Sequence, residues 1–148
     1  SMIFIQANAI GYKPTWFGVD GMDGILNLEN FDTSLAEGLM LLTPFAADAT
    51  DDLTVNFVNT YKEQYGDTPI QFAADAYDCL YAIKNAAEKA NVTPDMSVSD
   101  ICDALETAMP EITFNGLTGE NIKFNSDGEP DKAPKAVVIK DGAYVLAD

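Results

Sequence analysis

The sequence contains no histidine, and this absence removes several kinds of chemistry at once. Histidine is the usual general base near neutral pH, the partner of nucleophilic serine or cysteine, and a common ligand of transition metals. The two cysteines, Cys79 and Cys102, are too few and too far apart in the sequence for a zinc site. Both lie in stretches typical of helices, which favours two small buried apolar side chains over a disulfide between neighbouring helices. We therefore expect no bound metal, no cofactor and no histidine-based catalysis.

Basic residues are also scarce. Eight lysines, with no arginine, stand against 24 aspartates and glutamates, giving a formal net charge of −16. A protein that reads the phosphate backbone of nucleic acid needs a basic face, so we expect no nucleic-acid partner. The acidic residues are spread along the chain, as on a well-solvated surface.

Long apolar runs are absent as well, since no run approaches the ~20 residues that cross a bilayer. The opening stretch, SMIFIQANAIG, has neither a basic flank nor a small-residue cleavage site, so it does not have the features of a signal peptide. A serine before the methionine is typical of a removed tag. We expect either a small cytosolic protein or a fragment of a longer one.

The apolar patterns predict alternating helices and strands, and thus the α/β class. A helix is expected over residues 2–10, with a stop at Gly11. An apolar run at residues 15–19 predicts a buried strand, and a second apolar strand is expected over residues 38–43.

Three further helices follow, in the stretches LTVNFVNTYKEQY, QFAADAYDCLYAIKNAAEKA and SVSDICDALETAM. The first begins after aspartates and ends at Gly66, and the third begins at Ser97 or Ser99. In the middle helix we expect the inward face to carry Ala76, Tyr77, Leu80, Ile83 and Ala87.

The C-terminal part changes to an alternating pattern. Strands are predicted near residues 117–124, 135–140 and 143–146, with Asp-Gly turns at 127–128 and 141–142. The stretch NSDGEPD at 125–131 carries oxygen ligands but lacks the spacing of a calcium-binding loop, so a hairpin turn is the favoured interpretation.

The stretch FGVDGMDGIL, at residues 17–26, gathers glycines and two acids directly after an apolar run. Its glycines do not have the GxGxxG spacing of a dinucleotide fingerprint, and no GK[ST] follows. Asp20 and Asp23 miss the Asp-x-Asp spacing of phosphate-transfer nucleophiles, so a glycine turn leaving a strand is favoured by these residues alone. Ligands of α/β sheets bind beyond the carboxyl ends of strands, where Asp20 lies. A carboxylate there, beside glycines that let a ligand approach, suits an ammonium group.

Five segments in order resemble one family. These are GxDG, AEGLMLLTPF, FVNTYKEQYGDTP, AADAYDCLYAIKNAAEKA and FNGLTGENIKFNSDGEP. Together they are similar to the C-terminal part of periplasmic binding proteins of the leucine/isoleucine/valine type, the substrate-binding subunits of ABC importers. The resemblance covers essentially the whole chain.

The resemblance implies a fragment of a two-lobed type 1 periplasmic-binding-protein fold, with helices packed on a mostly parallel sheet and C-terminal hairpins. Residues 1–43 resemble a segment of the second lobe, and residues 44–115 resemble helices of the first lobe. Residues 116–148 would form the hairpins that cross back. Such proteins are more than twice as long as this chain and close around their ligand.

The resemblance also implies a ligand site. Asp20 occupies the position of the acidic residue that binds the ligand's α-ammonium group, with Gly21 beside it. Phe72 matches an aromatic residue that lines the side-chain pocket, although a core phenylalanine is an equal alternative by position. No residue is expected to be catalytic or to bind a metal.

The expected function is therefore that of an extracytoplasmic solute-binding component of an ABC importer for branched-chain or related amino acids. It would lie in the periplasm, or lipid-anchored at the outer face of the membrane, with permease subunits as partners. One alternative is the amino-acid-sensing domain of a receptor or regulator. A more distant one is a small acidic metal-dependent hydrolase using Asp20 and Asp23. The isolated fragment is expected to self-associate through an open sheet edge.

Overall fold

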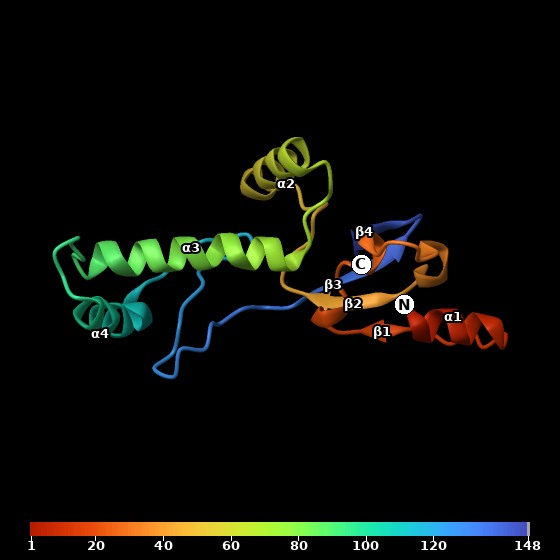
Figure 1. Cartoon of the computed structure of the whole chain (residues 1–148), viewed down its shortest axis with the longest axis horizontal. Helices are drawn as coiled ribbons and strands as arrows, with labels where there is room; N and C mark the ends of the chain where they lie inside the picture. Colours follow the sequence, from red (N-terminus) through yellow and green to blue (C-terminus); the bar gives the residue numbers. More distant parts are fainter. Residues whose placement is uncertain (148) are drawn as a thin grey trace. The chain divides into compact units, whose positions relative to one another are not determined.

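A computed structural model describes residues 1–147 of the 148-residue chain (Figure 1). The chain forms two compact units. The first unit consists of Ser1–Gln71 and the C-terminal stretch that starts at Pro134, and the second unit is Phe72–Ala133. The chain therefore passes from one unit to the other twice, at residues 71–72 and 133–134. The described residues form both helices and strands, which confirms the predicted α/β class, although the order is mixed: α2, α3 and α4 follow one another, as do β3 and β4.

The helices of the first unit begin and end at the predicted signals. Helix α1 (Met2–Ala9) is followed by Gly11, whose φ of +69° is the left-handed conformation expected of a helix stop. Helix α2 (Asp52–Tyr65) begins where the Asp51 side chain accepts a hydrogen bond from the Thr54 backbone N–H, and it ends at Gly66, with φ of +75°. The stretch between the first two strands forms short 3₁₀ turns, η1 (Asp20–Met22), η2 (Ile25–Asn27) and η3 (Thr33–Ala36).

The four strands of the first unit form one sheet in the order β1-β2-β3-β4, with β2 lying between β1 and β3 (Figure 1). The strands are β1 (Phe17–Gly18), β2 (Met40–Thr43), β3 (Lys135–Lys140) and β4 (Ala143–Leu146). Only the β1–β2 pair is parallel, whereas the β2–β3 and β3–β4 pairs are antiparallel. The expectation of a mostly parallel sheet is thus wrong for the described residues. Strands β3 and β4 are antiparallel because the turn between them, at Asp141 and Gly142, has φ values of 52° and 73° and reverses the chain within two residues.

Strand β1 differs from the predicted buried strand over residues 15–19. It has two residues, and Phe17 is 73% exposed. A Cβ placed on Gly18 would lie 2.4 Å from Leu41 Cδ2, so residue 18 faces the neighbouring strand's side chains. Because successive residues of a strand point to opposite faces, Phe17 and Val19 face solvent, while Trp16 packs against the core.

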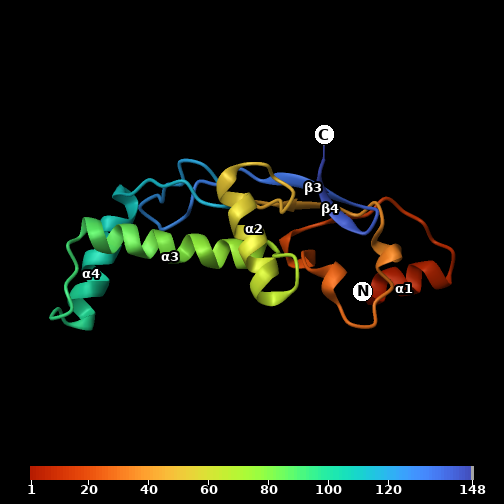
Figure 2. The ribbon, with the colours of Figure 1, turned by 90° about the horizontal axis from the view of Figure 1, so that it is seen from above.

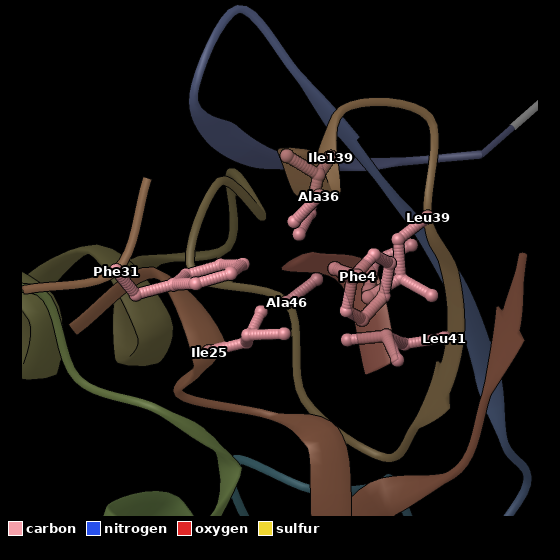
Figure 3. Packing of buried hydrophobic residues seen from close by; sticks show 9 residues of the cluster. Phe4, Ile25, Phe31, Ala36, Leu39, Leu41, Ala46 and Ile139 are labelled. Carbon is pink, nitrogen blue, oxygen red and sulfur yellow. The ribbon is translucent and has the colours of Figure 1, made fainter. Parts of the chain in front are cut away.

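The core of the first unit gathers large side chains from helix α1, the 3₁₀ turns and the sheet, and Figure 3 shows them pointing toward one another. The ring of Phe4 in α1 lies 4.7 Å from the ring of Trp16 and 6.2 Å from that of Phe31, measured between centroids. The buried members are Phe4, Ile25, Phe31, Ala36, Leu39, Leu41, Ala46, Val137 and Ile139. This packing fixes the segment that carries Asp20 and Asp23 against the sheet.

The second unit is built on two helices, α3 (Gln71–Lys89), whose first residue still belongs to the first unit, and α4 (Val98–Ala108). Both views show α4 beside the C-terminal half of α3 (Figures 1 and 2). Ser97 caps α4, as one of the two predicted caps, by accepting a hydrogen bond from the Asp100 backbone N–H at 3.2 Å. A 3₁₀ turn, η4 (Met109–Glu111), follows α4. The contact between α3 and α4 is made by small residues, because Ala82 and Ala86 of α3 and Ala108 of α4 lie at its centre.

The buried face of α3 is not the predicted one. Leu80 is 70% exposed and Ile83 is half exposed, whereas Ala74, Asp78, Ala82 and Ala86 are buried. The reason lies in the segments that pack on this helix. The loop at residues 117–118 binds the Asp78 side chain, and α4 packs on Ala82 and Ala86. Both contacts lie on the side of α3 that carries its small and polar residues.

The predicted strand at residues 117–124 is also absent from the described structure. This stretch makes only isolated bridges, Phe114 with Ile122 and Phe124 with Pro130. The backbone N–H groups of Leu117 and Thr118 donate to Asp78 rather than to a neighbouring strand. The turn at Asp127–Gly128 is confirmed, with Gly128 at a φ of +81°.

Both cysteines were expected to be buried, and this expectation is wrong. Cys79 and Cys102 are exposed free thiols. Cys79 lies on the outward side of α3, one position beyond the buried Asp78. No disulfide links the two.

Candidate functional site

Asp20 lies two residues beyond the end of β1, in the turn η1. Its side chain is exposed, and its Oδ1 accepts a hydrogen bond from the Gly21 backbone N–H at 2.8 Å. The turn is closed by backbone bonds, because Met22 N donates to Val19 O and Asp23 N donates to Asp20 O, both at 2.9 Å. The carboxylate is thus presented to solvent beyond the carboxyl end of a strand, as the sequence predicts.

Gly21 is the glycine of this stretch that the fold itself does not require. Gly24 has a φ of +88°, and a Cβ on Gly18 would meet Leu41. By contrast, a Cβ on Gly21 would meet no atom within 4 Å, and Gly21 is exposed. The absence of a side chain at Gly21 therefore leaves the surface beside the Asp20 carboxylate open.

Asp23 has a different role from Asp20. Its carboxylate is partly buried and accepts two backbone hydrogen bonds, Oδ1 from Gly24 N at 2.9 Å and Oδ2 from Gln71 N at 2.7 Å. The second bond ties Asp23 to the first residue of α3. Asp23 therefore holds the turn in place, and the two aspartates do not act as an acid–base pair.

Tyr144, in β4, supports the same turn from the sheet. Its hydroxyl oxygen accepts a hydrogen bond from Gly24 N at 3.0 Å. Burial raises the pKa of the Tyr144 hydroxyl above its usual range, and the neighbouring charge of Asp23 raises it further. Tyr144 therefore remains neutral at physiological pH and serves as a fixed hydrogen-bonding group.

Gln71 connects the Asp20 turn to strand β2. Its side chain is 1% exposed, and Nε2 donates to the Asp20 carbonyl oxygen at 2.8 Å. Its Oε1 lies 3.0 Å from the Thr43 hydroxyl, which can donate to it. The sequence reasoning missed Gln71, Thr43 and Tyr144, because they come from separate segments and share no spacing. The one local indication in the sequence is that Gln71 directly precedes Phe72, a predicted ligand-binding residue.

Phe72 lies in the first turn of α3, at the start of the second unit. Its side chain is 48% exposed. It is therefore not a buried core residue of the described second unit. An aromatic surface of this kind is available to a ligand.

Two hollows in the first unit bear on the site. A hollow of about 180 Å³ is lined in part by Gly21, Met22 and Asp23, next to the Asp20 turn. A larger cleft of about 480 Å³ lies between the β3–β4 turn and the loop at residues 67–70, and neither Asp20 nor Gly21 lines it. Its acids accept hydrogen bonds from distant segments, Asp48 from Leu146 N and Asp67 from Asn27, whereas the Asp20 carboxylate accepts one from the adjacent Gly21 N. The carboxylate of Asp20 is the better candidate for a charged ligand group.

Neither metal ligation nor membrane insertion is indicated for residues 1–147. Within this range, no group of three or more acidic or cysteine side chains is placed to hold a metal ion. None of the helices in this range combines the length and the hydropathy that a bilayer span requires.

The profile of a family described as periplasmic binding protein matches residues 3–143. No curated protein sequence matches the chain. A leucine binding protein of Thermotoga maritima is similar in structure, with a TM-score of 0.77, 24% identity, and coverage of 99% of this chain and 40% of that one.

Two further solved structures show the range of ligands. A branched-chain amino acid transporter substrate binding protein of Streptococcus pneumoniae, in complex with isoleucine, has a TM-score of 0.76 and 24% identity, covering 96% of this chain and 38% of that one. A solute binding protein of Rhodopseudomonas palustris, in complex with benzoate, has a TM-score of 0.78 and 16% identity, covering 97% of this chain and 38% of that one. At these identities the similarity is one of fold, and the chain spans about 40% of the length of the first matched structure.

Proposed function

The chain belongs to the periplasmic binding protein family, and we propose that it is the C-terminal part of a substrate-binding protein of an ABC importer for branched-chain or related amino acids. The family and its structural relatives are solute-binding proteins rather than enzymes. A hydrolase that uses Asp20 and Asp23 together is further disfavoured because Asp23 already accepts two backbone hydrogen bonds.

The observation that carries the proposal is the exposed carboxylate of Asp20 in a turn that other residues hold rigidly. A carboxylate and an ammonium group form a charge-assisted hydrogen bond, which is stronger than a neutral one. Because the turn is fixed by Asp23, Gln71 and Tyr144, little ordering is needed when the ligand binds. In this proposal Asp20 binds the α-ammonium group of the amino acid.

Gly21 and Phe72 complete the set of proposed contacts. Gly21 leaves room for the ligand backbone beside Asp20, since a Cβ there would occupy open space. Phe72 contributes a half-exposed aromatic surface that suits an apolar side chain. The benzoate complex of a structural relative shows that the fold alone does not require an amino group in the ligand. In this proposal the preference for amino acids rests on Asp20.

The test is calorimetric titration of leucine into the full-length protein and its Asp20→Ala variant. We expect Asp20→Ala to lose about 2–5 kcal/mol of binding free energy, because the ligand ammonium would be desolvated without a partner. Asp103→Ala is the control, since Asp103 is an exposed acid of α4. Leucine affinity of Asp20→Ala within threefold of the wild type would reject the assignment.

Phe72 is tested by the choice of ligand. Phe72→Ala should weaken the binding of leucine far more than that of glycine, because the lost contribution is burial of apolar surface. An equal loss for both ligands, or only a lower melting temperature, would assign Phe72 a purely structural role.

The proposal extends to the setting of the protein. It would act outside the cytoplasmic membrane, in the periplasm or lipid-anchored at the outer face, and deliver its ligand to permease subunits. Residues 1–43 would belong to the second lobe and residues 44–115 to the first lobe, and residues 116–148 would form the hairpins that cross back.

Self-association of the isolated 148-residue chain is also part of the proposal. Within residues 1–147, β1 pairs with β2 on one side only, and Phe17 and Val19 beside that open edge are exposed. Light scattering should therefore give a mass above the 16.0 kDa of one chain. A monomer would reject this part.

A further inference from the structure

The buried amide of Gln71 points to a role beyond packing. We propose that Gln71 is a positioning residue for amino-acid binding, which acts through Asp20 by fixing the backbone of the turn that presents the carboxylate. This inference rests on the proposed function of Asp20. Gln71 itself need not touch the ligand, because its side chain is 1% exposed and its amide is already hydrogen-bonded.

The orientation of the Gln71 amide follows from its partners. The Asp20 carbonyl oxygen can only accept a hydrogen bond, so the amide nitrogen faces it, at 2.8 Å. The amide oxygen then faces the Thr43 hydroxyl at 3.0 Å, and Thr43 is the last residue of β2. Gln71 thereby links the Asp20 backbone to the end of the strand next to β1. This link holds the turn at a defined position relative to the sheet.

The backbone of Gln71 makes a second, independent connection to the same turn. Its N–H donates to Asp23 Oδ2 at 2.7 Å. A side-chain substitution leaves this N–H in place, so the start of α3 remains tied to Asp23 when the amide is removed. The side-chain amide and the backbone N–H can therefore be tested separately.

Gln71→Met is the informative substitution, because methionine has a similar length and no amide. The Asp20 carbonyl keeps its bond from Asp23 N when the amide is removed. Thr43 keeps the Phe45 carbonyl as an acceptor for its hydroxyl, at 3.1 Å. The variant should fold, but the position of the Asp20 turn is no longer fixed from the sheet.

The experiment measures leucine affinity of the full-length wild type, Gln71→Met, Asp20→Ala and Val58→Ala by calorimetry. Val58 is a buried apolar residue of α2 and serves as a control for general destabilisation. We expect Gln71→Met to weaken leucine binding about tenfold, because a small displacement of a binding group has a large effect on an oriented interaction. Val58→Ala should change it less than twofold.

A second variant supplies a readout that a purely structural role would not change. In Gln71→Glu, burial favours the protonated acid, whose O–H can donate to the Asp20 carbonyl as the amide does. Leucine binding by Gln71→Glu should therefore recover toward the wild-type value at about pH 5 and weaken at about pH 8. The wild type, measured over the same range, is the reference. This variant also serves if Gln71→Met does not fold.

The outcomes separate the two proposals. If Asp20→Ala loses leucine binding while Gln71→Met matches Val58→Ala and Gln71→Glu follows the wild type with pH, the role of Gln71 is rejected and that of Asp20 stands. If Asp20→Ala binds leucine as the wild type does, the ammonium site is rejected, and the positioning role is rejected with it. Loss in both Asp20→Ala and Gln71→Met, with pH-dependent recovery in Gln71→Glu, supports both.

Discussion

Gln71 in the first unit and Asp78 in the second are both buried polar residues of α3, and each holds a loop by hydrogen bonds. The Asp78 carboxylate accepts from Leu117 N at 2.8 Å, from Thr118 N at 2.9 Å and from the Thr118 hydroxyl at 2.6 Å. Gln71 holds the Asp20 turn by two hydrogen bonds, from its side-chain amide to the Asp20 carbonyl and from its backbone N–H to the Asp23 carboxylate. Asp78 thus holds its loop as an acceptor of hydrogen bonds, and Gln71 holds its turn as a donor.

The two loops differ in what they leave at the surface. The residues that Asp78 holds, Leu117 and Thr118, are themselves buried. The turn that Gln71 holds leaves the carboxylate of Asp20 and the open side of Gly21 at the surface. Buried hydrogen bonding alone therefore does not distinguish the two loops, whereas the groups that each loop exposes do. We expect Asp78 to matter for stability and Gln71 for binding.

The largest effect is expected from Asp78→Ala. Three donors would lose their acceptor in a buried loop, so the variant should lower the free energy of unfolding by about 3–5 kcal/mol. Urea unfolding of the full-length protein measures the change, with Asp103→Ala as the exposed-acid control. A loss below about 1 kcal/mol would show that Asp78 does not fix this loop.

A pair of glycine substitutions sharpens the comparison with a smaller effect. A Cβ on Gly116 would lie 2.5 Å from the Asp78 carboxylate, so Gly116→Ala should destabilise the protein by about 1–3 kcal/mol without a specific effect on leucine affinity. Gly21→Ala meets no atom of the chain, so it should leave stability unchanged and weaken leucine binding. Unfolding and calorimetry on both variants check this. A loss of leucine affinity in Gly116→Ala together with a loss of stability in Gly21→Ala would refute the distinction between the two loops.

The smallest effect concerns alkaline pH. Burial, first of all, raises the pKa of Tyr144 above the ordinary value of 10.0, so its stabilising contribution is fully present below pH 10.0 and is lost as pH rises through the higher folded-state pKa. In the second unit, the hydrogen bond with Tyr81 is the main cause that raises the pKa of Tyr77, to about 12. Spectroscopic titration should show late ionisation of both phenols, and Tyr144→Phe should remove one late-titrating group. An unchanged titration would contradict the burial of the Tyr144 hydroxyl.

The features that could be predicted from the sequence are those with local causes. Gly66, Ser97 and the Asp141–Gly142 turn each act through neighbouring backbone groups, and the structure places helix ends and a strand reversal there. The family resemblance, carried by segments spread along the chain, is confirmed by the family match over residues 3–143. The position of Asp20 beyond a strand end also followed from a local pattern.

The features that could not be predicted depend on contacts between distant residues. The buried face of α3 is the one that carries Asp78, because a loop about 40 positions away in the sequence binds that side chain. The apolar pattern of the helix does not indicate this face. The hydrogen bonds from Gln71 to Asp20 and Asp23 span 51 and 48 positions, and no spacing within one segment could indicate them. The hydrogen bonds that hold the Asp20 turn could therefore not be predicted from the sequence.

The most direct test of the central claim is a crystal structure of the full-length protein with leucine bound. The account predicts that the leucine nitrogen lies about 2.7–2.9 Å from a carboxylate oxygen of Asp20, with the ligand backbone against Gly21. It also predicts that Asp23 keeps its hydrogen bonds to Gly24 N and Gln71 N in the complex. A leucine nitrogen bound elsewhere, for example to Asp48 or Asp67 in the cleft of about 480 Å³, would contradict it.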